Sequence, residues 1–374
     1  GNFEHSIITI LKSRYQEAYQ SMIARLLCYD SIGFSCYKSN FMATQEIALI
    51  LKKNKPDLRI ILGGPEITAC YFKFQEGLTM QFNDFADFIV VGEGERPLSD
   101  YLTKKNASSS IALFQEIDDL ENTGGPDFSD FDLNTYLKKA ALPLMLSRGC
   151  IKKCRFCAER LLYKKFRPHA IPAIIQQINY FKDQNINTFI FHDSLINGNL
   201  VWLDSLCEAL IENFGSIPWE AQCAIRNDMP EELLEKIRRS GCYHLFVGLE
   251  SGCSRTLKNM NKGYNALEAR EFFKRLNKAG LSFGISILVG FPGETREDFE
   301  ESLQFVINNK ELIPKIEQVN PFVYYEGIHC QEASDYKSNP ELLERAQCFI
   351  KKIKEKGIKH TNAFLLNLVE PQWK

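Results

Sequence analysis

Short apolar runs alternate with amphipathic stretches along this sequence, and the alternation predicts parallel strands separated by helices. In the first third of the chain, the runs that predict strands occupy residues 6–11, 29–37, 58–62 and 88–91. Amphipathic stretches between them, such as residues 43–53, predict helices. We therefore expect residues 1–110 to form a doubly wound, Rossmann-like α/β domain, whose ligands bind beyond the carboxyl ends of the strands.

The same alternation returns after residue 140 and predicts a second α/β domain. Apolar runs that predict six strands occupy residues 142–146, 188–192, 219–225, 244–249, 282–289 and 316–325. They predict a partial (β/α)6 TIM barrel over residues 141–326, with its chemistry at the carboxyl ends of the strands. We expect the acidic residues 111–140 to link the two domains, and residues 327–374 to form a short helical C-terminal extension.

Three cysteines follow the first predicted barrel strand at the spacing C-x3-C-x2-C: Cys150, Cys154 and Cys157. Three thiolates can hold an iron–sulfur cluster and leave one iron open to another ligand. Phe156 places an aromatic ring beside the third cysteine. The alternatives are three free thiols or part of a zinc site, although the chain has no second C-x2-C pair of the kind that a zinc ribbon needs.

Polar residues and glycine turns follow the next four predicted strands. In chain order these residues are Asp193, Arg226, Glu250, Ser251, Gly290 and Pro292. A carboxylate can accept hydrogen bonds from an ammonium group, and a guanidinium group can clamp a carboxylate. The alternatives are that Asp193 caps a helix, that Arg226 forms a structural salt bridge, and that the residues after Pro292 only begin a helix.

Together, these motifs between residues 33 and 325 resemble those of the radical S-adenosylmethionine (SAM) enzymes. The resemblance implies a 4Fe–4S cluster on the three cysteines, with an open iron that chelates the amino and carboxylate groups of SAM. It also implies that Asp193 holds the amino group, Arg226 the carboxylate, Glu250 and Ser251 the ribose, and the turn at Gly290 and Pro292 the adenine. Phe156 can shield the cluster or a bound base. Lys262 resembles a recurrent lysine of the family, without an assigned role.

Residues 33–37, 62–66 and 87–95 resemble the cobalamin-binding domain that precedes many radical SAM domains. The resemblance implies that Ser35, Gly63, Gly64 and Glu93 contact cobalamin. The usual Asp-x-His-x-x-Gly motif is absent, because Phe3 stands two residues before His5. This leaves three alternatives: a truncated N-terminus, cobalamin bound without a histidine ligand, or a domain that no longer binds it.

Composition narrows the function classes further. The net charge of −2 argues against a general nucleic-acid-binding surface, and no apolar run approaches the roughly 20 residues that span a bilayer. Twelve cysteines without a signal peptide indicate a reducing compartment, so we expect a cytoplasmic protein.

We expect a radical SAM enzyme that methylates an unactivated carbon with cobalamin, using an electron donor such as flavodoxin or ferredoxin. The substrate class stays open among small molecules, lipids and peptides. One alternative is a cobalamin-independent cyclisation, rearrangement or oxidation with a vestigial N-terminal domain. Another is a non-catalytic iron–sulfur electron carrier, which needs neither an open iron nor polar strand ends.

Overall fold

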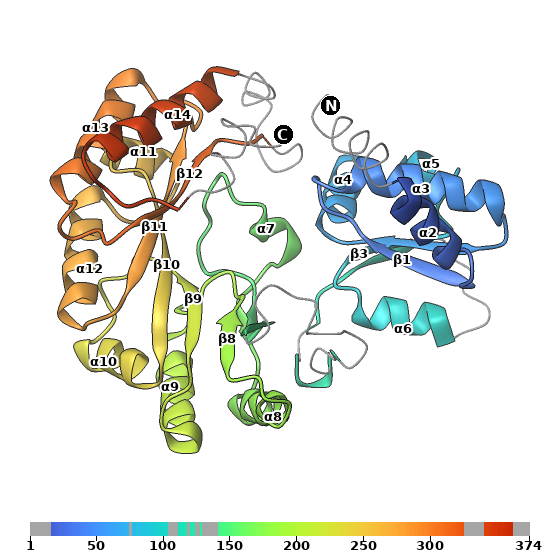
Figure 1. The fold of residues 1–374 in the computed structure, drawn as a ribbon, viewed down its shortest axis with the longest axis horizontal. Coiled ribbons are helices and arrows are strands. Elements are labelled where there is room, and N and C mark those ends of the chain that lie inside the picture. The colour runs from blue at the N-terminus through green and yellow to red at the C-terminus, as the bar shows by residue number, and fades with distance from the viewer. Residues whose placement is uncertain are drawn as a thin grey trace. The chain divides into compact units, whose positions relative to one another are not determined.

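The computed structural model describes residues 16–74, 77–103, 111–117, 120–123, 128, 141–324 and 340–361. These residues fall into two compact units (Figure 1). The N-terminal unit consists of the chain up to residue 118 and a short return at residues 161–164. The barrel unit consists mainly of residues 119–160 and 165–325, with the C-terminal helix. The predicted strand at residues 6–11 and most of the predicted linker lie outside the described residues.

The N-terminal unit is built on a parallel sheet with the strand order β1-β2-β3-β4. The strands are β1 (Ser31–Ser35), β2 (Arg59–Gly63), β3 (Phe88–Gly92) and β4 (Ile111–Gln115). The helices are α2 (Gln16–Leu26), α3 (Phe41–Asn54), α4 (Pro65–Phe74), α5 (Leu78–Phe82) and α6 (Glu95–Thr103). Figure 1 shows α6 on the opposite face of the sheet from α3, so helices cover both faces. The predicted Rossmann-like α/β fold is confirmed.

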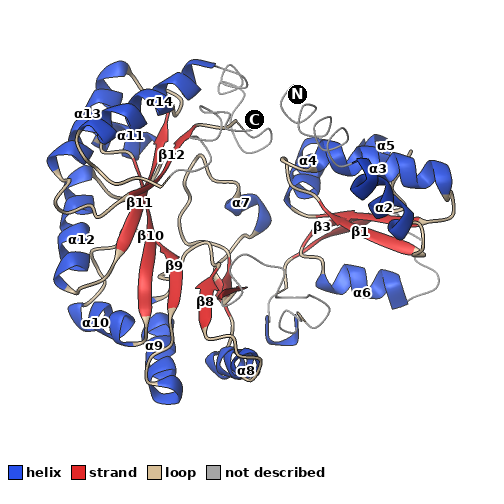
Figure 2. Cartoon of the chain, in the orientation of Figure 1, coloured by secondary structure: helices blue, strands red, loops and turns tan. Residues whose placement is uncertain are grey.

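The barrel unit contains a six-stranded parallel sheet whose strands follow the chain order (Figure 2). Its strands are β5 (Ala141–Leu144), β8 (Thr188–Phe191), β9 (Trp219–Cys223), β10 (Cys242–Glu250), β11 (Phe283–Val289) and β12 (Ile316–Pro321). The connecting helices include α8 (Ile171–Lys182), α9 (Leu200–Phe214), α10 (Glu231–Arg239), α12 (Ala266–Lys278) and α13 (Arg296–Asn308). The predicted partial (β/α)6 barrel is confirmed.

Four short elements lie in the loops that follow the barrel strands. Strands β6 (Ser147–Arg148) and β7 (Arg167–Pro168) form an antiparallel pair, and helices α7 (Glu159–Leu162) and α11 (Ser254–Asn259) follow β6 and β10. Local sequence fixes where the longer helices begin. Asn265 and Glu268 form a capping box at α12, and Thr295 and Asp298 form one at α13.

The two faces of the barrel sheet differ in chemistry. Apolar strand residues such as Phe189, Trp219 and Val247 are fully buried in a core that also contains apolar residues of the surrounding helices. On the other face, Ser286 lies beside Gln318 in register, and His244 bonds to Glu317. Strands of parallel sheets are usually apolar on both faces, so this polar inner face marks the side that receives ligands.

Helix α14 (Pro340–Glu355) forms the described part of the predicted C-terminal extension, and it packs against α13 and β12. The chain after this helix returns along β12. The Ile316 N–H donates to the Lys359 carbonyl at 2.8 Å, and the Thr361 N–H donates to the Ile316 carbonyl at 3.0 Å. Residues 327–339 and 362–374 lie outside the described residues.

Among the helices of the described segments, none is long and apolar enough to cross a bilayer.

Two glycines with positive φ provide a test of the packing. Gly241 has a φ of 108°, and a Cβ there would lie 2.0 Å from the Ile217 carbonyl oxygen. Gly215 has a φ of 68°, and a Cβ there would meet nothing within 4 Å. We expect Gly241→Ala to lower the free energy of unfolding by about 3 kcal/mol or more, because the backbone strain of an alanine at positive φ and the steric overlap of its Cβ both destabilise the folded state. Gly215→Ala should cost only about 1 kcal/mol. Urea unfolding of both variants measures the difference, and equal losses would contradict the packing described here.

Candidate active site

The cluster loop, residues 150–157, follows β6 and carries the three cysteines of the sequence motif. Gly149 turns the chain into this loop with a φ of 81°. All three thiols are free; Cys154 is buried and Cys150 and Cys157 are half-buried. The three thiols interact electrostatically with one another, so the fold gathers them at one place.

Burial raises the pKa of all three thiols, and it raises the pKa of Cys157 to about 12. Without metal, the thiols therefore keep their protons at neutral pH, and a bound metal must displace them. The positive charges of Lys262 and Lys152 act in the opposite direction on Cys154. Three converging thiols with cationic neighbours fit an iron–sulfur cluster that has three protein ligands.

A turn after α11, residues 260–263, docks on the cluster loop, and we call it the lysine turn. The Arg155 N–H donates to the Met260 carbonyl at 2.9 Å. The Asn261 side-chain amide donates to the Lys153 carbonyl at 2.9 Å. Asn261 and Gly263 have φ values of 59° and 73°, which asparagine and glycine adopt more readily than other residues. The docking brings Lys262 into the site.

Lys262 is only 9% exposed and lies among four groups of the site. Its Nζ is 3.5 Å from Glu250 Oε1, and 5.4 and 5.7 Å from the ring centroids of Phe156 and Tyr264. Burial opposes the charged form, but Tyr264, Glu250 and Cys154 together raise the pKa of Lys262, so it stays protonated. Sequence reasoning assigned no role to Lys262 and did not single out Tyr264, because neither burial nor these contacts are visible in local sequence.

Asp193 follows β8 and is 1% exposed. The Ser147 hydroxyl donates to Asp193 Oδ1 at 2.6 Å, while Oδ2 is buried without a hydrogen-bond partner in the part of the chain that the structure describes. Burial raises the pKa of Asp193 to about 7. The N-cap of α9 is Asn199, so Asp193 does not cap this helix. An unpartnered carboxylate oxygen fits a hydrogen-bond donor supplied by a ligand.

Arg226 follows β9, and its guanidinium group is already engaged by the protein. Its Nε and Nη2 donate to the two carboxylate oxygens of Asp228 at 3.0 and 2.6 Å. Its Nη1 donates to the carbonyls of Asn197 and Gly198 at 2.7 and 3.2 Å. The structural salt bridge, which was one of the two roles considered for Arg226 from the sequence, is thus present. Contact of Arg226 with a ligand carboxylate stays a prediction.

Glu250 and Ser251 end β10 in different environments. Glu250 has a φ of 67°, a sparsely populated value that often occurs at functional sites. The Ser286 hydroxyl donates to Glu250 Oε2 at 3.2 Å, which holds the carboxylate on the inner face beside Lys262. Ser251 is fully buried, and its Oγ accepts the Cys253 N–H at 3.1 Å. Glu250 is therefore the better placed of the two for contact with a ligand.

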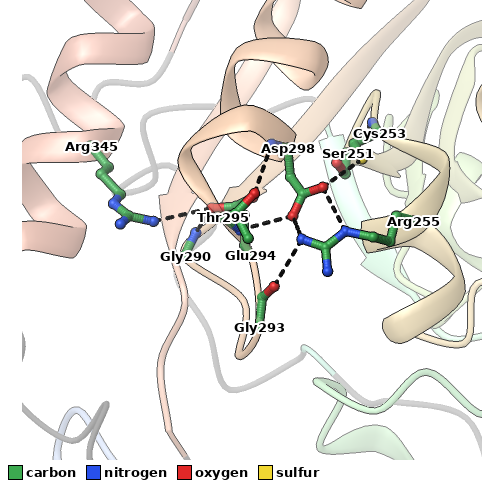
Figure 3. Close-up of polar contacts among 9 residues, drawn as sticks. All are labelled: Ser251, Cys253, Arg255, Gly290, Gly293, Glu294, Thr295, Asp298 and Arg345. Atoms are coloured by element: carbon green, nitrogen blue, oxygen red, sulfur yellow. Dashed lines mark hydrogen bonds and ion pairs between the residues drawn. The ribbon is translucent and has the colours of Figure 1, made fainter.

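The turn after β11 contains Gly290 and Pro292 and is fixed by Glu294 (Figure 3). The Gly290 N–H donates to Glu294 Oε2 at 2.6 Å, and Arg345 of α14 lies 3.8 Å from the same oxygen. Burial raises the pKa of Glu294 to about 7. Figure 3 also shows Asp298, which joins this turn to the turn after β10 through its bonds to Arg255. The adenine contact predicted at Gly290 and Pro292 stays a prediction.

Three of the four residues predicted for cobalamin, Ser35, Gly63 and Gly64, lie at the carboxyl ends of two neighbouring strands of the N-terminal unit. Ser35 is exposed at the end of β1, beside Gly63 in register. Gly64 has a φ of 98°, and a Cβ there would lie 2.8 Å from the backbone nitrogen and oxygen of Cys36. Turn packing therefore explains this glycine. Glu93, the fourth, is 5% exposed and accepts the Ile117 N–H at 2.6 Å, so its carboxylate faces the protein.

The position of these turns in the sheet matters as well. Ligands of open parallel sheets bind where the strand order reverses. The described strands of this unit follow the chain order, so such a reversal is not among them. The described residues fit cobalamin in part, through the accessible ends of β1 and β2.

The buried carboxyl group of Asp193 predicts a pH-dependent stability. Its folded-state pKa of about 7 exceeds the usual 3.8, so the contribution of Asp193 to the unfolding free energy is greatest below pH 3.8 and falls as the pH rises towards 7. Asp193→Asn removes this dependence. Without cofactors, the variant should be more stable than the wild type at pH 8, by at most about 4 kcal/mol, and by less at pH 5. Urea unfolding at both pH values, with the surface variant Asp183→Asn as control, measures this. An advantage that is equal at both pH values would contradict it.

Comparisons with known proteins agree with this geometry. An uncharacterized methyltransferase from Pyrococcus horikoshii is 26% identical over 301 residues, which cover 74% of this chain and 63% of the relative. An anaerobic magnesium-protoporphyrin IX monomethyl ester cyclase from Synechocystis is 24% identical over 326 residues, which cover 79% and 64%. The chain thus spans less than two thirds of the length of these curated relatives.

A solved structure shows the same fold over most of the chain. The radical S-adenosylmethionine methyltransferase TsrM from Kitasatospora setae, with cobalamin and a [4Fe–4S] cluster bound, superposes with a TM-score of 0.67 at 14% identity. The superposition covers 87% of this chain and 71% of TsrM. Residues 144–306, which contain the cluster loop, Asp193, Glu250 and the lysine turn, match the family model of the radical SAM superfamily. This match identifies residues 144–306 as a radical SAM domain, and such a domain implies a 4Fe–4S cluster and SAM as cofactors.

Proposed function

We propose that this chain cleaves SAM reductively at a 4Fe–4S cluster held by Cys150, Cys154 and Cys157, and uses the radical to methylate an unactivated carbon with the help of cobalamin. The observation that carries the proposal is that three free thiols, a buried lysine and an unpartnered carboxylate oxygen all follow the carboxyl ends of parallel barrel strands. The active sites of barrels of this kind lie at the carboxyl ends of their strands.

The cluster and SAM together would supply a 5′-deoxyadenosyl radical that takes a hydrogen atom from the substrate. The residues of the chain itself bind SAM and hold it in position. Asp193 Oδ2 accepts a hydrogen bond from the SAM ammonium group, which satisfies the oxygen left without a partner. Glu250 accepts hydrogen bonds from ribose hydroxyls at the end of β10. The ring of Phe156 packs beside the apolar residues Met260 and Phe291 and keeps water from the cluster.

Methylation is supported by the names of the relatives and by the fold of TsrM. The accessible ends of β1 and β2 support a cobalamin site on the N-terminal unit, where Ser35 and Gly63 would meet the ligand. Two observations count against a cobalamin site with a histidine ligand and a contact from Glu93. Residues 16–118 contain no histidine, and Glu93 faces the protein. We therefore propose cobalamin bound without a histidine ligand from this segment.

A second candidate, from the cobalamin-independent cyclisation, rearrangement or oxidation considered above, is a cyclisation without methyl transfer. The similarity to the anaerobic cyclase extends over 79% of the chain, as broad as the similarity to the methyltransferase. Both candidates need an electron donor, for which a flavodoxin or ferredoxin is the expected class. Both use the same cluster and the same SAM contacts, so they differ only in the use of cobalamin.

The cluster assignment predicts a selective effect of cysteine replacement. Wild-type protein reconstituted anaerobically should hold about four iron atoms per chain and release 5′-deoxyadenosine from SAM when reduced. Cys150→Ala, Cys154→Ala and Cys157→Ala should each lose most of the iron and this product. Cys348→Ala, at an exposed cysteine of α14, should behave like the wild type. Full iron content in any of the three loop variants would rule that cysteine out as a ligand.

The cobalamin assignment is tested by cobalt retention. Protein mixed with hydroxocobalamin and passed through gel filtration should retain cobalt in a stoichiometric amount relative to the protein chain. Ser35→Trp, at the exposed carboxyl end of β1, should retain less cobalt because the indole ring would block access of cobalamin to this end of the strand. Ser99→Trp, exposed on α6, is the matched control. Iron without cobalt in the wild type would favour the cyclisation candidate.

A further inference from the structure

We infer that Lys262 is an electrostatic positioning residue of the cluster, which holds a fixed positive charge beside Cys154 and thereby favours the reduced state of the iron–sulfur cluster. This inference rests on the proposed cluster at the three cysteines. It assigns a role to a residue that is buried next to the site for no evident reason of stability.

The position of Lys262 is fixed by the backbone around it. The lysine turn is bound to the cluster loop by the Arg155 and Asn261 hydrogen bonds, both 2.9 Å long. The Lys262 N–H itself donates to the Leu257 carbonyl at 3.1 Å, which closes the turn onto α11. These bonds hold the backbone of the lysine turn against the cluster loop, so the side chain of Lys262 starts from a fixed position beside that loop.

Lys262 has one carboxylate partner, Glu250, in the part of the chain that the structure describes. The side chains of Lys262 and Glu250 are 11% and 15% exposed, and their 3.5 Å contact is long for an ion pair. Tyr264 donates its hydroxyl hydrogen to the carbonyls of Gly248 and Leu249 at 2.8 and 2.9 Å, so its oxygen can face the ammonium group. Desolvating a buried cation and its carboxylate is costly, and a further anion nearby offsets part of that cost. The thiolates of the cluster loop are that anion.

The effect on the cluster follows from charge. Reduction adds one negative charge to a cluster that already carries three thiolate ligands. A fixed cation in a region of low dielectric stabilises the state with more negative charge, so it raises the reduction potential. Glu250 acts with the opposite sign, because its charge disfavours negative charge on Cys154. Lys262 and Glu250 should therefore move the potential in opposite directions.

A different role for Lys262, contact with the carboxylate of SAM, makes a different prediction. A residue that only binds SAM would change the affinity for SAM and leave the cluster unaffected in its absence. The reduction potential measured without SAM separates the two roles, and it does not depend on turnover.

The experiment is a redox titration of reconstituted protein without SAM, followed by the electron paramagnetic resonance signal of the reduced cluster. Lys262→Met should lower the ratio of reduced to oxidised cluster at a fixed potential about tenfold, which corresponds to about 59 mV for one electron. Lys262→Arg keeps the charge and should stay near the wild type. Lys258→Met removes an exposed charge from α11, the helix before the lysine turn, and is the matched control. An unchanged potential in Lys262→Met, or an equal shift in Lys258→Met, would overturn the inference.

A second variant decides the question if Lys262→Met does not take up iron. Glu250→Gln removes the opposing charge and should raise the ratio of reduced to oxidised cluster at the same potential. A potential that falls or does not move in this variant would overturn the inference. Failure of the wild type to bind a cluster would instead overturn the proposed function, so the two failures are distinguishable.

Discussion

The docking of the lysine turn on the cluster loop is the contact on which the site depends. It joins the loop after the first barrel strand to the turn after the fourth, through Arg155 and Asn261. Parallel strands bring all their carboxyl ends to one rim, but they do not fix the loops that follow. The two hydrogen bonds supply that constraint and bring Lys262 close enough to the cluster loop to act electrostatically on Cys154.

The site concentrates polar groups that a stable core would avoid. Asp193 and Glu294 are buried carboxyl groups with raised pKa values, and Lys262 is a buried cation. Perturbed groups of this kind often gather at functional sites, because binding rather than stability requires them. The outer face of the same sheet compensates: Phe189 and Trp219 are fully buried in one continuous apolar core.

Hydrophobic periodicity predicted the α/β fold and all six barrel strands, because strand and helix patterns are local. The three cysteines and Asp193 also stand out from local spacing and strand position. The pairing of Arg226 with Asp228 and the packing reason for Gly64 needed coordinates. The role of Lys262 could not be predicted for a physical reason: its position depends on a contact between the lysine turn and a loop 108 residues earlier in the chain.

The return of the chain along β12 has a consequence for any shortened form of this protein. Residues 359–361 pair with Ile316, so the beginning of the last strand does not present its backbone groups to solvent. An unpaired strand edge is a template for pairing with other chains. Trimming the chain back before α14 would uncover that edge together with the apolar residues that α14 covers, among them Phe299, which stacks edge-on against Phe349. Self-association, rather than a loss of the site, would then be the first defect of such a fragment.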